Sequence, residues 1–251
     1  MRIAVIADIH GNVVALDAVL ADIARRGADM TVNLGDIVSG PLYPTETADR
    51  LMPLGFPTIR GNHDRQVLAG GLAEMGASDL FAASRLRADQ TAWLAGLPAT
   101  LRLSDAVLLV HGTPSSDLAY FLETIDADGF RPAAPEDIEE RAGADPARLI
   151  LCGHSHLQRM ARTRDGRLVV NPGSVGLPAY ADDLPYPHKV EAGSPHARYA
   201  LIDMQARDIA VEFVSVAYAW DKAAAAAEAH GRPDWAKALR TGTMPVLPTG
   251  T

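Results

Sequence analysis

The sequence predicts a layered α/β fold, and two features of its N-terminal region lead to this prediction. Apolar runs of strand length alternate there with stretches whose apolar residues recur at helical spacing, in the order strand, helix, strand, helix, strand. Each of these apolar runs precedes a short polar motif rich in glycine, aspartate and histidine or asparagine. In an open α/β sheet, functional sites are built in the crevice beyond the carboxyl ends of the strands, so we expect the motifs to meet there.

The first strand and helix have the clearest signals. Ile3–Ala7 is a continuous apolar run, as expected for a strand in a sheet that is covered on both faces. Asn12 can cap a helix from Val13 to Ile23, in which apolar residues recur every three or four positions, and Gly27 ends it. The next expected elements are a strand at Met30–Leu34, a helix at Thr45–Leu54 and a strand at Thr58–Arg60.

The rest of the chain alternates strand pairs with polar segments, after a weakly patterned helical stretch that reaches about Gly96. The expected strands are Leu101–Leu103 with Val107–Val110, Leu149–Cys152, Gln158–Arg164 with Arg167–Asn171, and Tyr199–Met204 with Ile209–Val216. The expected terminal helices are Ala219–Ala229 and Trp235–Leu239. We interpret residues 1–251 as one domain, with 113–147 as a cap insertion, 177–197 as a loop or lid, and 241–251 as a flexible tail.

Composition narrows the classes of protein that fit. The chain has 251 residues, of which 48% are apolar, and a formal net charge of −8. General nucleic-acid binders and anionic-membrane binders are normally basic, so neither extended nucleic-acid docking nor membrane association is expected. The single cysteine, Cys152, cannot form an internal disulfide, and no apolar run approaches the length of a membrane span. We therefore expect a soluble cytoplasmic protein. The sequence does not indicate its oligomeric state.

Five motifs carry metal-binding side chains. They are D-I-H at Asp8–His10, G-D at Gly35–Asp36, G-N-H-D at Gly61–Asp64, H-G at His111–Gly112, and G-H-S-H at Gly153–His156. Five of the eight histidines fall in them, each after an apolar, strand-like run. A single motif of this kind is usually a structural turn, but their joint occurrence predicts a metal site.

The donor types favour two divalent cations. Two aspartates, an asparagine amide and four imidazoles form a mixed oxygen and nitrogen set, which suits Mn, Fe, Ni, Co or Zn; we favour Mn. Asp36 is the best candidate to bridge the two ions, because one carboxylate offers two oxygens. His63 follows the donor Asn62 and is placed to protonate a leaving group as a general acid.

In order and spacing, these motifs resemble the calcineurin-like metallophosphoesterase superfamily. The resemblance covers residue 1 to about residue 176 and implies a four-layer α/β/β/α sandwich with a dinuclear site at its top. By position, it implies that Asp8, His10, Asp36 and His156 hold one metal ion, that Asp36, Asn62, His111 and His154 hold the other, and that His63 is the acid.

Within that superfamily, the segment Gly35–Pro41 resembles the small bacterial phosphodiesterases. The Ser/Thr protein phosphatases follow G-D with a further acid and an arginine, where this chain has Ser39 and Gly40. The carboxylate that would support the acid and an arginine that would grip phosphate are therefore missing at those positions, so phosphoproteins are not expected substrates. Asp64 could support His63 instead, although adjacent side chains seldom face each other.

The resulting hypothesis is a hydrolase of small phosphodiesters or phosphomonoesters, with nucleotides favoured, that uses a hydroxide bound to two metal ions and His63 as acid. One alternative is hydrolysis of dinucleoside polyphosphates, which needs positive charge that Arg60, Arg131 or Arg159 could supply. Arg60, beside the G-N-H-D motif, is a candidate substrate-binding residue in either case. An alternative of another class is a non-catalytic scaffold that binds metal and a partner.

Overall fold

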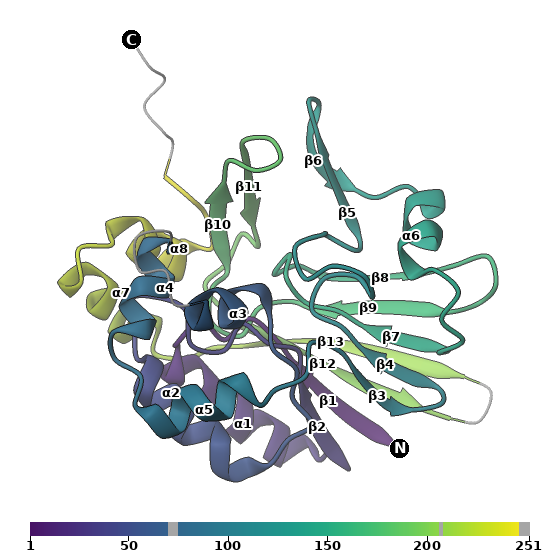
Figure 1. Ribbon diagram of the computed structural model, residues 1–251, viewed down its shortest axis with the longest axis horizontal. Coiled ribbons are helices and arrows are strands. Elements are labelled where there is room, and N and C mark those ends of the chain that lie inside the picture. The colour runs from purple at the N-terminus through teal and green to yellow at the C-terminus, as the bar shows by residue number, and fades with distance from the viewer. Residues whose placement is uncertain (70–74, 206–207, 246–251) are drawn as a thin grey trace.

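The computed structural model describes residues 1–69, 75–205 and 208–245, and it is built around two β-sheets (Figure 1). The first sheet has the strand order β13-β12-β1-β2, with bounds β13 Ile209–Val216, β12 Ala197–Met204, β1 Arg2–Ile6 and β2 Met30–Asn33. The second has the order β3-β4-β7-β9-β8, with bounds β3 Leu101–Ser104, β4 Val107–Leu109, β7 Leu149–Leu151, β9 Leu168–Pro172 and β8 Gln158–Arg162.

The two sheets pack face to face. Alternate residues of β1, including Ile3 and Val5, point into the same buried cluster as Leu109 of β4 and Leu151 of β7. The other side chains of β1, such as Ile6, pack instead against helix α1. The strand-length apolar runs of the sequence therefore serve two cores, one on each face of the sheet.

Helices form the two outer layers. The outer face of the first sheet packs on α1 (Val13–Arg26), which Asn12 caps through a hydrogen bond from the Ala15 amide, and Gly27 ends this helix. The remaining helices on this side are α2 (Pro44–Leu51), the 3₁₀ turn η1 (Met52–Leu54), α3 (Asn62–Leu68), α4 (Ala77–Ala83) and α5 (Ala88–Ala95). On the outer face of the second sheet lies α6 (Pro135–Ala142), which buries Ile138 against β4 and β7. The predicted four-layer α/β/β/α sandwich is thus confirmed.

Three smaller units stand above the sheet edge at which the motifs lie (Figure 1). They are the hairpin of β5 (Glu123–Asp126) and β6 (Gly129–Pro132), the hairpin of β10 (Ala179–Asp182) and β11 (His188–Glu191), and the helix pair α7 (Trp220–Ala229) and α8 (Pro233–Thr241). The helix pair packs on β10 in its own apolar cluster, which includes Leu42, Leu177 and Trp235.

Some local expectations need correction. The predicted strand Thr58–Arg60 is reduced to one bridge between Asn33 and Thr58, because the Arg60 amide donates to Pro98 rather than to a neighbouring strand. The segment 177–197, expected as an irregular loop, contains the β10–β11 hairpin. In the predicted tail 241–251, Thr241 still belongs to α8, and residues 246–251 lie outside the described residues. Among the helices described, none is long and apolar enough to cross a membrane.

Candidate functional site

Four strands bring four of the five motifs to one place, and the fifth, Gly61–Asp64, begins helix α3 beside Asp36. β1 and β2 are parallel neighbours, with Ile6 opposite Asn33, and they lead into the loops that carry Asp8 and Asp36. β4 and β7 are also parallel, with Leu109 opposite Leu151, and they lead to His111 and His154. Because parallel strands end at the same edge, residues that are far apart in the sequence converge between the tops of the two sheets.

The structure groups the predicted donors into two clusters. Asp8, His10 and His156 offer donor atoms that all lie within 4.8 Å of one another, and Asp36, His111 and His154 do the same. In the first cluster, the Nε2 atoms of His10 and His156 are 3.0 Å apart. In the second, the Nε2 atom of His111 is 3.0 Å from the Asn62 amide oxygen. Each cluster could therefore hold one metal ion.

Asp36 lies between the clusters. Its Oδ2 atom is 3.9 Å from Nε2 of His10 and 3.3 Å from Nε2 of His111, so one carboxylate oxygen approaches a donor of each group. The other oxygen, Oδ1, accepts the backbone amide hydrogen of His63 at 2.9 Å. Gly61 lets this carboxylate approach, because a Cβ added there would lie 2.1 Å from Asp36 Oδ1.

Backbone carbonyls orient the imidazoles. The Nδ1 atoms of His10, His111 and His156 lie 2.8–2.9 Å from the carbonyl oxygens of Ser39, Leu34 and Leu177, respectively. His154 is reversed, with its Nε2 atom 3.0 Å from the Leu118 carbonyl. An Nδ1–H or Nε2–H that is engaged in this way leaves the other ring nitrogen with a lone pair for a cation.

Two further observations fit a cation at this site. Asp8 is fully buried, and its Oδ2 atom has no hydrogen-bond partner among the described residues, which is costly for a carboxylate unless a cation neutralises it. The non-glycine residues with positive φ in the described chain are Asp8, His10, Asp36, His154 and His156, and all five belong to the two clusters. Strained backbone of this kind marks functional sites, because only surrounding structure can hold it.

Electrostatics keep most of these imidazoles neutral. Burial lowers the pKa of His10 to about 4 and that of His154 to about 3, and it holds the pKa of His156 well below its usual range. Neutral imidazole is the form that binds metals. Burial also lowers the pKa of His111, but the Asp36 carboxylate outweighs it and raises that pKa to about 10.

His63 has a carboxylate partner that the sequence did not reveal. Its Nδ1 atom lies 2.8 Å from Oδ1 of Asp79, which is buried in the first turn of α4. Although burial opposes it, Asp36 and Asp79 raise the pKa of His63 to about 9, so the ring is protonated at neutral pH. Asp64, the partner considered from the sequence, instead accepts the amide hydrogens of Ile37 and Gly61. Asp79 lies in a weakly patterned stretch, so no sequence motif marks it.

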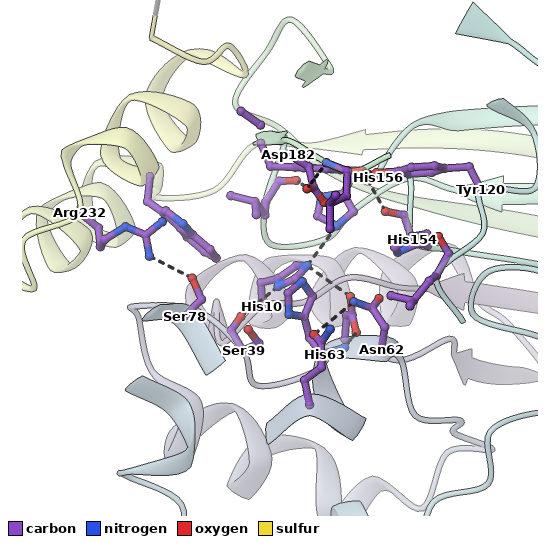
Figure 2. A pocket seen from close by; sticks show the side chains of 18 of the residues that line it. His10, Ser39, Asn62, His63, Ser78, Tyr120, His154, His156, Asp182 and Arg232 are labelled. Carbon is purple, nitrogen blue, oxygen red and sulfur yellow. Dashed lines mark hydrogen bonds and ion pairs between the residues drawn. The ribbon is translucent and has the colours of Figure 1, made fainter. Parts of the chain in front are cut away.

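A cavity of about 610 Å³ opens onto the two clusters (Figure 2). Besides donors and His63, it is lined by Tyr120, Tyr180, Arg232 and Trp235. The three arginines considered from the sequence do not line it: Arg131 pairs with Asp126, Arg159 pairs with Glu123, and the Arg60 amide is held by Pro98. The geometry therefore does not support substrate contact by Arg60, and a different arginine faces the cavity.

Comparison with known proteins agrees with this geometry. A curated relative, the uncharacterised protein MJ0912 of Methanocaldococcus jannaschii, is 27% identical over 93% of this chain and 94% of its own. Two crystal structures share the fold. A metallophosphoesterase from Sphaerobacter thermophilus is 25% identical, covers 97% of this chain and 100% of its own, and has a TM-score of 0.75. Hypothetical protein PH1004 from Pyrococcus horikoshii OT3 is 22% identical, covers 97% of this chain and 99% of its own, and has a TM-score of 0.73. The family model of the calcineurin-like phosphoesterase superfamily domain matches residues 1–192. The chain therefore belongs to the calcineurin-like phosphoesterase superfamily.

Proposed function

We propose that this protein hydrolyses phosphodiesters of small molecules, with nucleotides favoured, at a centre of two divalent metal ions. The observation that carries the proposal is the pair of donor clusters, in each of which the donor atoms lie within 4.8 Å of one another. The Asp36 carboxylate approaches a histidine of both clusters, and His63 lies beside them. We assign Asp8, His10, Asp36 and His156 to one ion and Asp36, Asn62, His111 and His154 to the other. The mixed oxygen and nitrogen donors suit Mn, which we favour, as well as Fe, Ni or Zn.

When bound, two such ions would supply the positive charge that activates water and stabilises the phosphoryl oxygens. The chain itself supplies the acid. His63 lines the cavity with its Nδ1 atom held by Asp79, which leaves Nε2 to give a proton to the leaving oxygen. Although burial lowers it, the Asp36 and Asp79 carboxylates raise the pKa of His63 overall, which favours the protonated ring that a general acid requires.

The shape of the cavity favours diesters over monoesters. Tyr120 and Arg232 line it on opposite sides of the donors (Figure 2), so it extends beyond the metal ligands in two directions. A phosphodiester has two substituents and can occupy both sides, whereas a monoester would fill one. The volume of about 610 Å³ lies in the range of small-molecule sites.

The test is hydrolysis of diphenyl phosphate, followed by phenol release, by the purified protein with added Mn(II), because phenol is a poor enough leaving group to need a proton from the acid. His63→Ala should lower kcat by about 100-fold to 10,000-fold while the metal content stays unchanged. His196→Ala is a matched control, because His196 packs on Trp220 and does not line the cavity. A wild-type protein that hydrolyses no phosphoester, or a His63→Ala variant with unchanged kcat, would contradict the proposal. Stoichiometric metal binding without any turnover would favour the scaffold alternative.

A further inference from the structure

Arg232 is the one arginine or lysine, among the described residues, whose side chain lines the cavity. It is the residue before helix α8 and lies beyond residue 192, where the match to the family model ends. Its side chain is 25% exposed, so its charge is only partly surrounded by protein. Nothing in the metal-binding or acid chemistry described above uses it.

The guanidinium of Arg232 is held in place yet keeps free donors. Its Nε and Nη2 atoms donate to the two carboxylate oxygens of Asp234 at 3.0 and 2.7 Å, and its Nη1 atom donates to Ser78 Oγ at 3.0 Å. A guanidinium has five N–H groups. Counted over the described chain, these three bonds leave one N–H on each terminal nitrogen. Paired N–H groups of a guanidinium match the spacing of carboxylate or phosphate oxygens.

The wall that carries Arg232 is packed against the metal-binding loops. The Trp235 ring, three residues further along, lies 6.0 Å from the His10 ring and 5.5 Å from the Arg232 guanidinium carbon. Gly40 makes this packing possible, since a Cβ there would lie 2.8 Å from the Trp235 ring and 2.6 Å from the His10 carbonyl oxygen. The position of Arg232 relative to the donors is therefore fixed by close packing.

Helix α4 places Arg232 on the same side of the cavity as the acid. Consecutive residues of its first turn hold the two groups: Ser78 accepts from Arg232 (Figure 2), and Asp79 pairs with His63. The substituent that His63 protonates is the leaving group, so a leaving group that extends away from His63 on this side reaches Arg232. Asp182, an exposed acid, also lines the cavity, but Figure 2 shows it across from His63.

We infer that Arg232, held by Ser78 and Asp234, is a specificity-determining residue that binds an oxyanion on the leaving group. The inference rests on the proposed function and sharpens its substrate class: diesters whose leaving alcohol carries its own phosphate or carboxylate. An uncharged leaving group fills the same space without contacting the two free N–H groups.

The kinetic test compares two chromogenic diesters, methyl 4-nitrophenyl phosphate and methyl 3-carboxy-4-nitrophenyl phosphate. They differ by one carboxylate on the leaving group. Arg232→Gln should raise KM for the carboxylated diester about tenfold and leave kcat and the constants for the uncharged diester within about twofold, as expected for loss of a charge-assisted hydrogen bond. Arg232→Lys keeps the charge but lacks the paired N–H groups, so its KM for the carboxylated diester should lie between those of wild type and Arg232→Gln. Equal effects of Arg232→Gln on both diesters would overturn the inference.

A binding test does not depend on turnover. Pyrophosphate and 4-hydroxybenzoate, which represent phosphate and carboxylate sources, are titrated calorimetrically into the metal-free protein in chelator. Wild type should bind at least one of them about tenfold more tightly than Arg232→Gln does. Arg240→Gln is the matched control, since Arg240 lies on α8, the helix that Arg232 precedes, but pairs with Asp221 and Glu228 outside the cavity. If neither anion distinguishes wild type from Arg232→Gln, the inference fails. A protein that binds the anion through Arg232 yet hydrolyses no diester instead refutes the proposed function alone.

Discussion

The floor and the rim of the cavity are built differently. We define the floor as the loops after β1, β2, β4 and β7, and the rim as residues 118–121, the β10–β11 hairpin and the helix pair α7–α8. The floor residues Asp8, Asp36 and His111 are at most 1% exposed, and strained backbone holds two of them. On the rim, Leu118 is 54% exposed and Leu184 is 74% exposed. The floor is therefore fixed in advance, as the proposed cations require, whereas Leu118 and Leu184 leave part of the rim exposed to solvent, where the substituents of the proposed substrate would lie.

The largest effect is expected from the loss of the Asp36 carboxylate in the floor. Asp36→Ala removes the oxygens that approach both donor clusters, so we expect both ions to bind weakly and hydrolysis to fall by more than about 100-fold. Metal analysis after dialysis, together with kcat, measures this. If Asp36→Ala retains two ions per chain, the bridging position assigned to Asp36 is wrong.

Loss of the Asp79 charge, which pairs with His63, should lower activity less than loss of Asp36 does. Asp79→Asn keeps the shape of the side chain but removes the charge beside His63, so kcat should fall about tenfold to 100-fold. The loss should be larger for a phenyl diester than for a 4-nitrophenyl diester, because a poorer leaving group depends more on the proton.

Ser39→Ala is the control for this variant. It removes the other side chain that is bonded to Asp79 and leaves the Ser39 carbonyl that orients His10. We expect an effect below about threefold. Equal losses in Ser39→Ala and Asp79→Asn would mean that Asp79 acts through packing rather than through His63.

The next prediction concerns stability and the ion pair between Glu123 and Arg159, in which the carboxylate is buried and the guanidinium is 33% exposed. Glu123 is fully buried and pairs with Arg159, so Arg159→Ala leaves a carboxylate unpaired and should destabilise the protein by about 2–3 kcal/mol. Arg164→Ala is the matched surface control: its pair with Glu136 is well exposed on both sides and should contribute less than about 0.5 kcal/mol. Urea unfolding monitored by circular dichroism measures the stability of both variants. Equal unfolding midpoints for Arg159→Ala and Arg164→Ala would contradict the prediction.

The smallest effect is expected on the rim. Tyr120 stacks on His154 with ring centroids 4.6 Å apart, and its hydroxyl bonds to Tyr180 and lies 3.1 Å from His188. Tyr120→Phe keeps the ring and should change kcat/KM by less than about threefold, with a loss of about 1 kcal/mol in stability. Tyr120→Ala should raise KM clearly more, and similar kinetics for the two variants would show that the ring is not used.

The sequence alone determined the layered fold and the composition of the floor. Apolar runs must be buried on both faces, and a motif directly after such a run has little freedom to lie anywhere but at the end of its strand. That is why Asp8, Asp36, His111 and His154 converge as expected. The strand predicted at Thr58–Arg60 is reduced to one bridge between Thr58 and Asn33, because three residues next to Pro57 carry too little pattern to specify longer pairing.

Only the tertiary structure decided the rim and the groups that orient the floor. Asp79 reaches His63 and Arg232 reaches the cavity through the packing of α4 and α8, which no local periodicity encodes. His188, which falls in the segment 177–197 that the sequence predicts as a loop or lid, is buried beside Tyr120 because residues 179–191 form a hairpin. Local sequence sets which residues follow a strand, but long-range packing sets which side chains from distant elements face them.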